Sequence, residues 1–282
     1  MKRNACKIFI LVMLFSLFAG CILPEGGGEF LGEYTDDKGD VYKSYKSRNG
    51  LYTYVEMPGG EISIEGYWGN KESITIPETI DGKKVTSSCM GIWWEGEERE
   101  DWRPRTSNLR RITYGSNIKK IGDFELAFYL SDSDSKRKRE YLGDVTELNF
   151  SEGLEEIRGG TLIHLRLEKL VLPKSLKKVS EWAFGSGLIV PVIVFLGNPA
   201  LEEVSLQITY RAAVQALGKP VEIYFYDDAT NVSEAAFASL GHDTEHSQKY
   251  VIIYHKPGAK GFEKFIDLGY DVRTFTDGEG PV

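Results

Sequence analysis

One segment has the residue spacing of a metal-dependent hydrolase. His242, Glu245 and His246 stand at H-x-x-E-H spacing, which on a helix places both imidazoles on one zinc ion and leaves the glutamate to activate water. The neighbouring residues oppose a helix, because Gly241 and Ser247 are poor helix formers and no apolar face runs through the segment. We therefore expect a solvated loop here, with no bound metal and no catalysis, and keep a zinc hydrolase as an alternative.

A cluster of aromatic and basic residues at positions 91–107 is the second candidate site. Trp93 and Trp94 are adjacent, so in an extended segment their side chains point to opposite sides and cannot both enter a core. Trp102 and Arg103 follow in the same segment. Exposed aromatics beside arginines are typical of protein-binding hot spots and of platforms that stack on sugars. The alternative is that Trp93 or Trp94 fills the core instead.

A third candidate site consists of every second residue along several short apolar segments. If these segments are strands with one face inward, the side chains between the buried ones point outward. Tyr224 and Tyr226 are the aromatic members of this row and are candidate binding residues. The outward positions are Arg111, Thr113, Glu147, Asn149, Lys169, Val171, Glu222, Tyr224 and Tyr226. Such a face is either a solvated sheet surface or a protein-binding strip.

The first residues of the chain indicate that the protein is targeted for secretion. Three cationic residues precede an apolar run at 8–18, which is the layout of a secretory signal peptide and predicts one at residues 1–20. The run ends in small residues before Cys21 and resembles the bacterial lipobox, with Phe18 where leucine is usual. The resemblance implies that Cys21 carries lipid, with residues 21–28 as a flexible tether.

Composition and cysteine number limit the remaining possibilities. The 282 residues are 41% hydrophobic and 27% charged, enough for a packed core. Lys and Arg number 34 against 42 Asp and Glu, giving a net charge of -8, so we expect no nucleic-acid partner. Of three cysteines, Cys6 leaves with the signal peptide and Cys21 is acylated. Cys89 then remains alone, which excludes an intramolecular disulfide.

A repeated spacing predicts the fold. A leading aliphatic residue is followed by apolar residues six and nine positions later, and five of six copies keep these offsets while the first has two extra residues. The copies begin at 74, 112, 148, 170, 195 and 223. Each copy is interpreted as a short strand, a turn and a closing segment whose apolar edge is buried only by its neighbours. The prediction is a mostly β solenoid of short parallel strands with coil or short helical returns, capped at both ends.

The repeats also resemble a known family. Residues 74–86, which begin Ile-Thr-Ile-Pro, and residues 170–184, which end in Ala-Phe, are similar to repeats of BspA-like leucine-rich repeat proteins of bacteria. The resemblance covers residues 50–240 and departs at 87–88, where Ile-Gly is usual, and at 90–94, where Ala-Phe is usual. It implies a curved solenoid on a secreted or surface protein, often involved in adhesion, and no catalytic residues.

The ends of the chain complete the expected organisation. We expect an N-terminal β cap at residues 29–68, the leucine-rich-repeat-like solenoid at 69–240, and a C-terminal strand-helix cap and tail at 241–282. Within the last region the patterns predict a strand at 250–254, a helix at 259–268 and a frayed tail from 274.

The sequence as a whole favours a binding protein. We expect a bacterial lipoprotein, anchored in the outer membrane or at the cell surface, that binds a protein or extracellular-matrix partner and uses no cofactor. A carbohydrate-binding module is the alternative, besides the zinc hydrolase. The partner, the membrane leaflet and the oligomeric state stay open.

Overall fold

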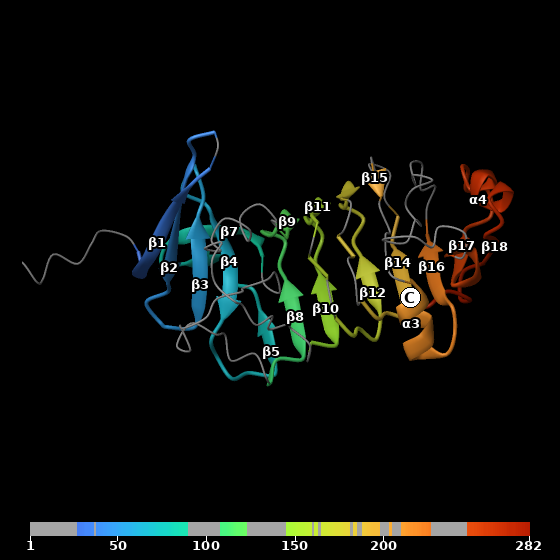
Figure 1. The fold of residues 1–282 in the computed structure, drawn as a ribbon, viewed down its shortest axis with the longest axis horizontal. Helices are drawn as coiled ribbons and strands as arrows, with labels where there is room; N and C mark the ends of the chain where they lie inside the picture. The colour runs from blue at the N-terminus through green and yellow to red at the C-terminus, as the bar shows by residue number, and fades with distance from the viewer. Residues whose placement is uncertain are drawn as a thin grey trace, which may run out of the picture.

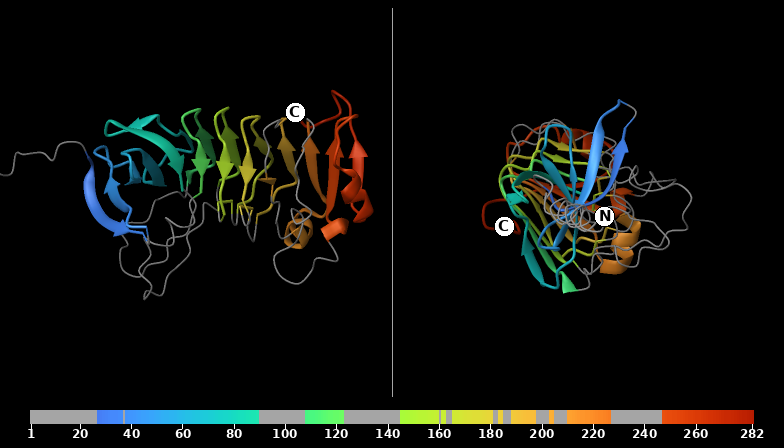
Figure 2. Two further views of the ribbon diagram at one scale, coloured as in Figure 1. Left: turned by 90° about the horizontal axis from the view of Figure 1, so that it is seen from above. Right: turned by 90° about the vertical axis from the view of Figure 1, so that its left-hand side faces the viewer.

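Two β-sheets run along the length of an elongated stack of coils (Figure 1). The computed structural model describes residues 27–36, 38–89, 108–122, 145–159, 161–162, 165–180, 183–184, 188–197, 203–204, 210–226 and 247–282. Figure 2 shows the strands of successive coils standing side by side along the long axis. Strands predominate in these residues and helices are few, which agrees with the fold class predicted from the repeats.

The eight-stranded sheet contains the leading strand of each coil. Its strands are β5 (Ser73–Thr75), β8 (Arg111–Tyr114), β10 (Glu147–Phe150), β12 (Leu170–Leu172), β14 (Val192–Phe195), β16 (Val221–Phe225), β17 (Val251–His255) and β18 (Asp271–Thr274). Neighbouring strands are parallel throughout. A continuous row of buried aliphatic residues lies in register across the first seven strands: Ile74, Ile112, Leu148, Leu170, Ile193, Ile223 and Ile253.

The ten-stranded sheet combines an antiparallel beginning with the short closing strands of the coils. Its strands are β1 (Glu29–Thr35), β2 (Val41–Lys46), β3 (Tyr52–Glu56), β4 (Ile62–Tyr67), β6 (Thr79–Ile80), β7 (Lys83–Ser88), β9 (Lys120–Ile121), β11 (Glu156–Ile157), β13 (Lys178–Val179) and β15 (Glu203–Val204). Strands β1 to β4 are antiparallel neighbours, and β4 then pairs in parallel with β7. The antiparallel segment therefore continues directly into the stack.

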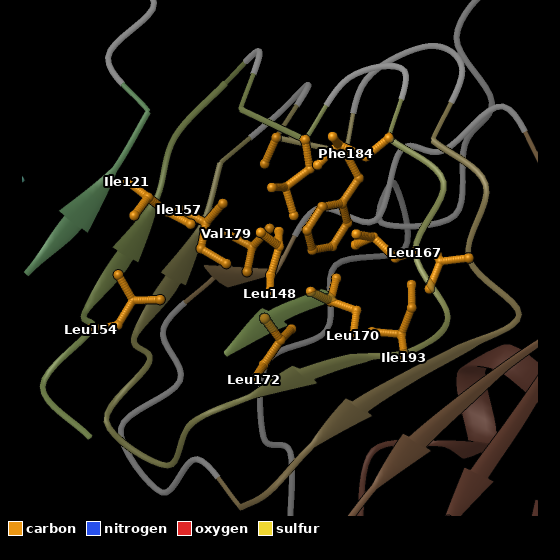
Figure 3. Close-up of a cluster of buried hydrophobic side chains, with 14 of the residues drawn as sticks. Ile121, Leu148, Leu154, Ile157, Leu167, Leu170, Leu172, Val179, Phe184 and Ile193 are labelled. Carbon is orange, nitrogen blue, oxygen red and sulfur yellow. The ribbon is translucent and has the colours of Figure 1, made fainter. Parts of the chain in front are cut away.

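The core lies between the two sheets. Ile121, Ile157 and Val179 project from the closing strands, and Leu148 and Leu170 project from the leading strands (Figure 3). Each coil contributes aliphatic side chains to one continuous core, because its own apolar edge is too small to be buried alone. Phe184 lies within the same cluster (Figure 3) and is fully buried.

The strand register corrects two details of the predicted repeats. Leu170 lies opposite Ile193, whereas Phe195 lies opposite Leu172, so the fifth copy begins at 193 and not at 195. In the first copy Ser88, and not Val85, lies opposite Ile121. In β14 both Ile193 and Phe195 are buried, and the spacing favours Phe195 because Leu201 and Val204 lie six and nine residues after it. In β7 every residue from Val85 to Ser88 is buried, and the polar Ser88 gives no apolar signal.

The C-terminal region differs from the predicted strand, helix and frayed tail. Strand β17 is present but belongs to the parallel ladder, and β18 adds a strand that the sequence patterns did not indicate. The helix α4 (Glu263–Asp267) is shorter than predicted. The predicted frayed tail is instead folded against the sheet, since Phe275 is 3% exposed.

One described helix was not predicted at all. Helix α3 (Tyr210–Leu217) contains alanine, glutamine and leucine, which favour helix, and among its residues 213–217 Ala213 is fully buried. Gly218 ends it at φ +69°, with its N–H bonded to the Val214 carbonyl at 2.7 Å. A short 3-10 helix at Ser247–Lys249 precedes β17.

Gly153 provides a test of how tightly the coils stack. It lies between β10 and β11 at φ +121°, and a Cβ there would lie 2.4 Å from the Ser116 carbonyl oxygen of the preceding coil. We expect Gly153→Ala to lower the free energy of unfolding by about 1–3 kcal/mol, because strain and contact act together. Gly218→Ala is the control, since its φ is also positive but nothing lies within 4 Å. Urea unfolding that showed an equal or smaller loss at Gly153 would contradict this close stacking.

Candidate functional site

The outward face of the eight-stranded sheet is the candidate site, and its first half is charged and polar. Arg111 on β8 pairs with Glu147 on β10, with Nε and Oε2 2.5 Å apart. The Asn149 side-chain amide donates to Glu147 Oε1 at 2.8 Å. The hydrogen bonds from Asn149 and from Arg111 lower the pKa of the Glu147 carboxyl below its usual range. Arg111 and Asn149 are exposed, so this part of the face is open to solvent.

The second half of the same face is apolar and aromatic. Val194 on β14 and Tyr224 on β16 form a small cluster with Phe275, separate from the main core. Tyr224 stacks on Tyr254 of β17 with ring centroids 4.4 Å apart and an angle of 3° between the planes. Burial raises the pKa of Tyr224 above its usual range, and the nearby Glu222 carboxylate acts in the same direction. The face therefore changes from charged to aromatic along the stack.

Residues 275–282 cover this aromatic half. The Phe275 ring lies 5.2 Å from that of Tyr224 and 4.9 Å from that of Tyr226. Tyr224, a candidate binding residue from the sequence, is consequently 7% exposed, and Tyr226 is half-buried. Both tyrosines do lie on the outward face. What covers them could not be read from the sequence, because residues 274–282 resemble an unstructured tail.

The other sequence-based candidates lie outside the described residues. These are Cys21, Trp93, Trp94, Trp102, Arg103, His242, Glu245 and His246. Within the part of the chain that the structure describes, no group of three or more His, Cys, Asp or Glu residues could hold a metal ion. In that same part, no helix combines the length and the apolar character needed to cross a membrane.

A buried carboxyl in the antiparallel segment was not anticipated from the sequence. Glu65 is 7% exposed; its Oε2 accepts a hydrogen bond from the Ser44 hydroxyl at 3.0 Å, and Oε1 has no partner among the described residues. Burial raises the pKa of Glu65 from 4.5 to about 7, against a smaller lowering by Ser44. The register places Thr53 opposite Gly66 and Tyr54 opposite Ile64, which leaves Glu65 as an extra residue. Alternation alone gives no signal of this bulge.

The fold and the face define a repeat protein whose regular strands display side chains in rows. No protein-family model matches the sequence, and no curated protein matches it. Three solved structures are similar over about four-fifths of this chain, all at low identity.

A leucine-rich repeat protein of T. pallidum is 16% identical with a TM-score of 0.36, covering 80% of this chain and 97% of that one. A leucine-rich repeat protein from Bacteroides ovatus is 14% identical with a TM-score of 0.38, covering 79% and 66%. A leucine-rich cell surface protein from Faecalibacterium prausnitzii is 12% identical with a TM-score of 0.28, covering 80% of this chain and 55% of that one.

Proposed function

We propose that this chain is a bacterial surface lipoprotein whose repeat solenoid binds a protein partner, in an adhesion-type interaction, through the outward face of the eight-stranded sheet. The observation that carries the proposal is the unbroken parallel register of that sheet, from β5 to β18. Neighbouring strands lie about 4.8 Å apart, so outward side chains form evenly spaced rows on a rigid support. Stacked repeats commonly use such extended faces for binding. The proposal includes no catalytic step.

The charged half of the face is the part available to a partner. Arg111 and Glu147 form an ion pair with side chains 50% and 37% exposed, and Thr113 and Asn149 flank it. An exposed pair of this kind adds little to folding stability. The two charges are therefore not needed for folding, and they can attract and orient a partner whose own charges are complementary.

The N-terminal end of the stack is the end that the proposed lipid would hold at the membrane. Gly28 N–H donates to the Tyr54 hydroxyl at 3.2 Å, and Arg48 Nε donates to the Gly27 carbonyl at 3.3 Å. Six residues after Cys21 the chain is thus already attached to the folded body. At about 3.3–3.6 Å a residue, the tether spans at most about 20 Å. The coils would then extend outward from the bilayer, with their faces accessible.

The anchoring part of the proposal predicts a clear loss. Cys21→Ala should abolish membrane association and leave a folded, soluble product, because the lipid would have no attachment point. Incorporation of labelled fatty acid and membrane fractionation measure the change. Cys6→Ala is the matched control and should incorporate lipid normally. Labelled fatty acid that persists in Cys21→Ala would refute this anchor.

The binding part is tested by capture of the native lipoprotein with its neighbours from intact cells. A photoreactive residue in place of Thr113 reports on the outward face, and one in place of Lys120 on the ten-stranded sheet serves as control. The proposal predicts a discrete crosslinked protein from position 113 that is weak or missing from position 120. Equal crosslinking from both positions would contradict binding through this face.

A further inference from the structure

The C-terminal segment crosses the outward face of the eight-stranded sheet as a strap. We use this name for residues 275–282, which follow β18 and turn back over β17 and β16 toward β12. Phe275 N–H donates to the His255 carbonyl at 3.1 Å. At the far end, the Lys169 ammonium donates to the Pro281 carbonyl at 3.1 Å. In Figure 1 the mark for the chain end overlaps β14 and β16, and in Figure 2 it lies at the edge of the stack, on the side away from helix α3.

The strap is held at its start by one aromatic ring and one carboxylate. Phe275 lies edge-on to Tyr224 and Tyr226, and the Lys256 ammonium lies 4.7 Å from the centre of the Phe275 ring. The same ammonium forms an ion pair with the Asp277 carboxylate. A single lysine thus contacts both the aromatic residue and the acid two positions after it.

Tyr226 holds the other end of the strap. Its hydroxyl donates to the Val282 carbonyl at 3.1 Å. Gly280 approaches so closely that a Cβ there would lie 2.0 Å from the Tyr226 hydroxyl oxygen. The backbone, and not a side chain, is what the face accepts at this point.

Between these two ends the strap makes its own turn and is open to solvent. Thr276 N–H donates to the Glu279 carboxylate at 2.7 Å, and Glu279 N–H donates to the Thr276 carbonyl at 3.1 Å. Thr276 through Glu279 are exposed, and the Asp277 side chain is 99% exposed. The strap therefore resembles a peptide ligand on a surface more than a strand of the stack. Its Phe275 is what covers the separate apolar cluster of Val194 and Tyr224.

We propose that the face formed by β14, β16 and β17 binds a short peptide segment of a protein partner that carries an aromatic residue two positions before a carboxylate, and that the strap occupies this face in cis. The inference rests on the proposed protein-binding function and specifies the chemistry of one partner. Tyr224 and Tyr226 would contact the aromatic residue of this peptide, and Lys256 would pair with its carboxylate. Aromatic and cationic side chains gathered in this way are typical of an interface hot spot. Because a tethered segment acts at an effective concentration near millimolar, the partner must displace it.

The test uses the full chain with Phe275→Ala, which weakens the strap and leaves Tyr224, Tyr226 and Lys256 intact. The probe is a fluorescein-labelled synthetic peptide of residues 275–282, the strap alone, followed by fluorescence anisotropy. We expect the variant to bind the peptide at least tenfold more tightly than the unaltered chain. A peptide with alanine in place of its phenylalanine should bind neither, and adding Lys256→Gln to the variant should weaken binding about tenfold.

Two outcomes would overturn the inference. One is a Phe275→Ala chain with unchanged circular dichroism that binds the peptide no better than the unaltered chain. If that variant fails to fold, Asp277→Ala replaces it, since the exposed carboxylate contributes nothing to the core. The second outcome that would overturn the inference is an Asp277→Ala chain that binds the peptide no better than the unaltered chain. Failure of this test would not concern the charged half of the face. Crosslinking at position 113 tests partner binding at that half independently.

Discussion

Leu172→Ala is expected to lower the free energy of unfolding by about 2–5 kcal/mol, the range for removing a large buried aliphatic side chain. Leu172 is fully buried at the end of β12 and lies opposite Phe195 in the register. Figure 3 shows it beside Leu170 in the core of the stack. The cavity would adjoin two neighbouring coils, which in a stack stabilise one another mainly through such contacts.

The control for this prediction is Lys174→Ala, two residues further along the chain and exposed. Its effect should stay within about 0.5 kcal/mol, as for most surface substitutions. Urea unfolding followed by circular dichroism gives both values. Equal midpoints for the two variants would mean that the inward register of β12 is incorrect.

The stability of the chain is expected to fall as the pH rises from 4.5 to 7, because of Glu65. Its carboxyl titrates near 4.5 when unfolded and near 7 when folded, so between these values the folded chain binds the additional proton. By linkage this costs on the order of 3 kcal/mol by pH 7, and the cost stays constant above it. Below pH 4.5 both states are protonated and the cost vanishes.

Replacing this carboxyl isolates its contribution. Glu65→Gln should remove the fall in stability between pH 5 and pH 7.5, whereas Glu168→Gln, at an exposed position, should leave it unchanged. Urea unfolding at several pH values measures the difference. A Glu65→Gln chain with the same pH dependence as the unaltered chain would show that this group does not titrate as its burial implies.

Much of the fold could be predicted because every coil buries its apolar residues in the same way, against the neighbouring coils. The spacing of six and nine residues marks one strand and its closing segment, so repetition reveals it even at low sequence similarity. The same spacing recurs at Ile253, Ala259 and Phe262, which explains why β17 joins the stack. The sequence is ambiguous there, because Phe262, Phe265 and Ile266 also fit the spacing of a helix.

The candidate face could be predicted only in part. Alternation correctly places Arg111, Asn149 and Tyr224 outward, since a strand has a period of two. The position of the strap over Tyr224 depends on the contact between Tyr224 and Phe275, which are about 50 positions apart in the sequence. The strap itself is rich in glycine and acidic residues and has no periodic pattern of apolar residues. The buried Glu65 depends on a one-residue register shift between β3 and β4, which only the paired strands reveal.

The most direct test of partner binding through the outward face compares two charge reversals of similarly exposed ion pairs. Arg111→Glu alters the Arg111–Glu147 pair on that face, and Lys177→Glu alters the Lys177–Glu155 pair beside the ten-stranded sheet. The measurement is the Kd of each variant for the protein crosslinked at position 113. We predict that Arg111→Glu weakens binding at least tenfold and that Lys177→Glu leaves the Kd within a factor of two. A partner bound equally well by both variants would contradict recognition through the outward face.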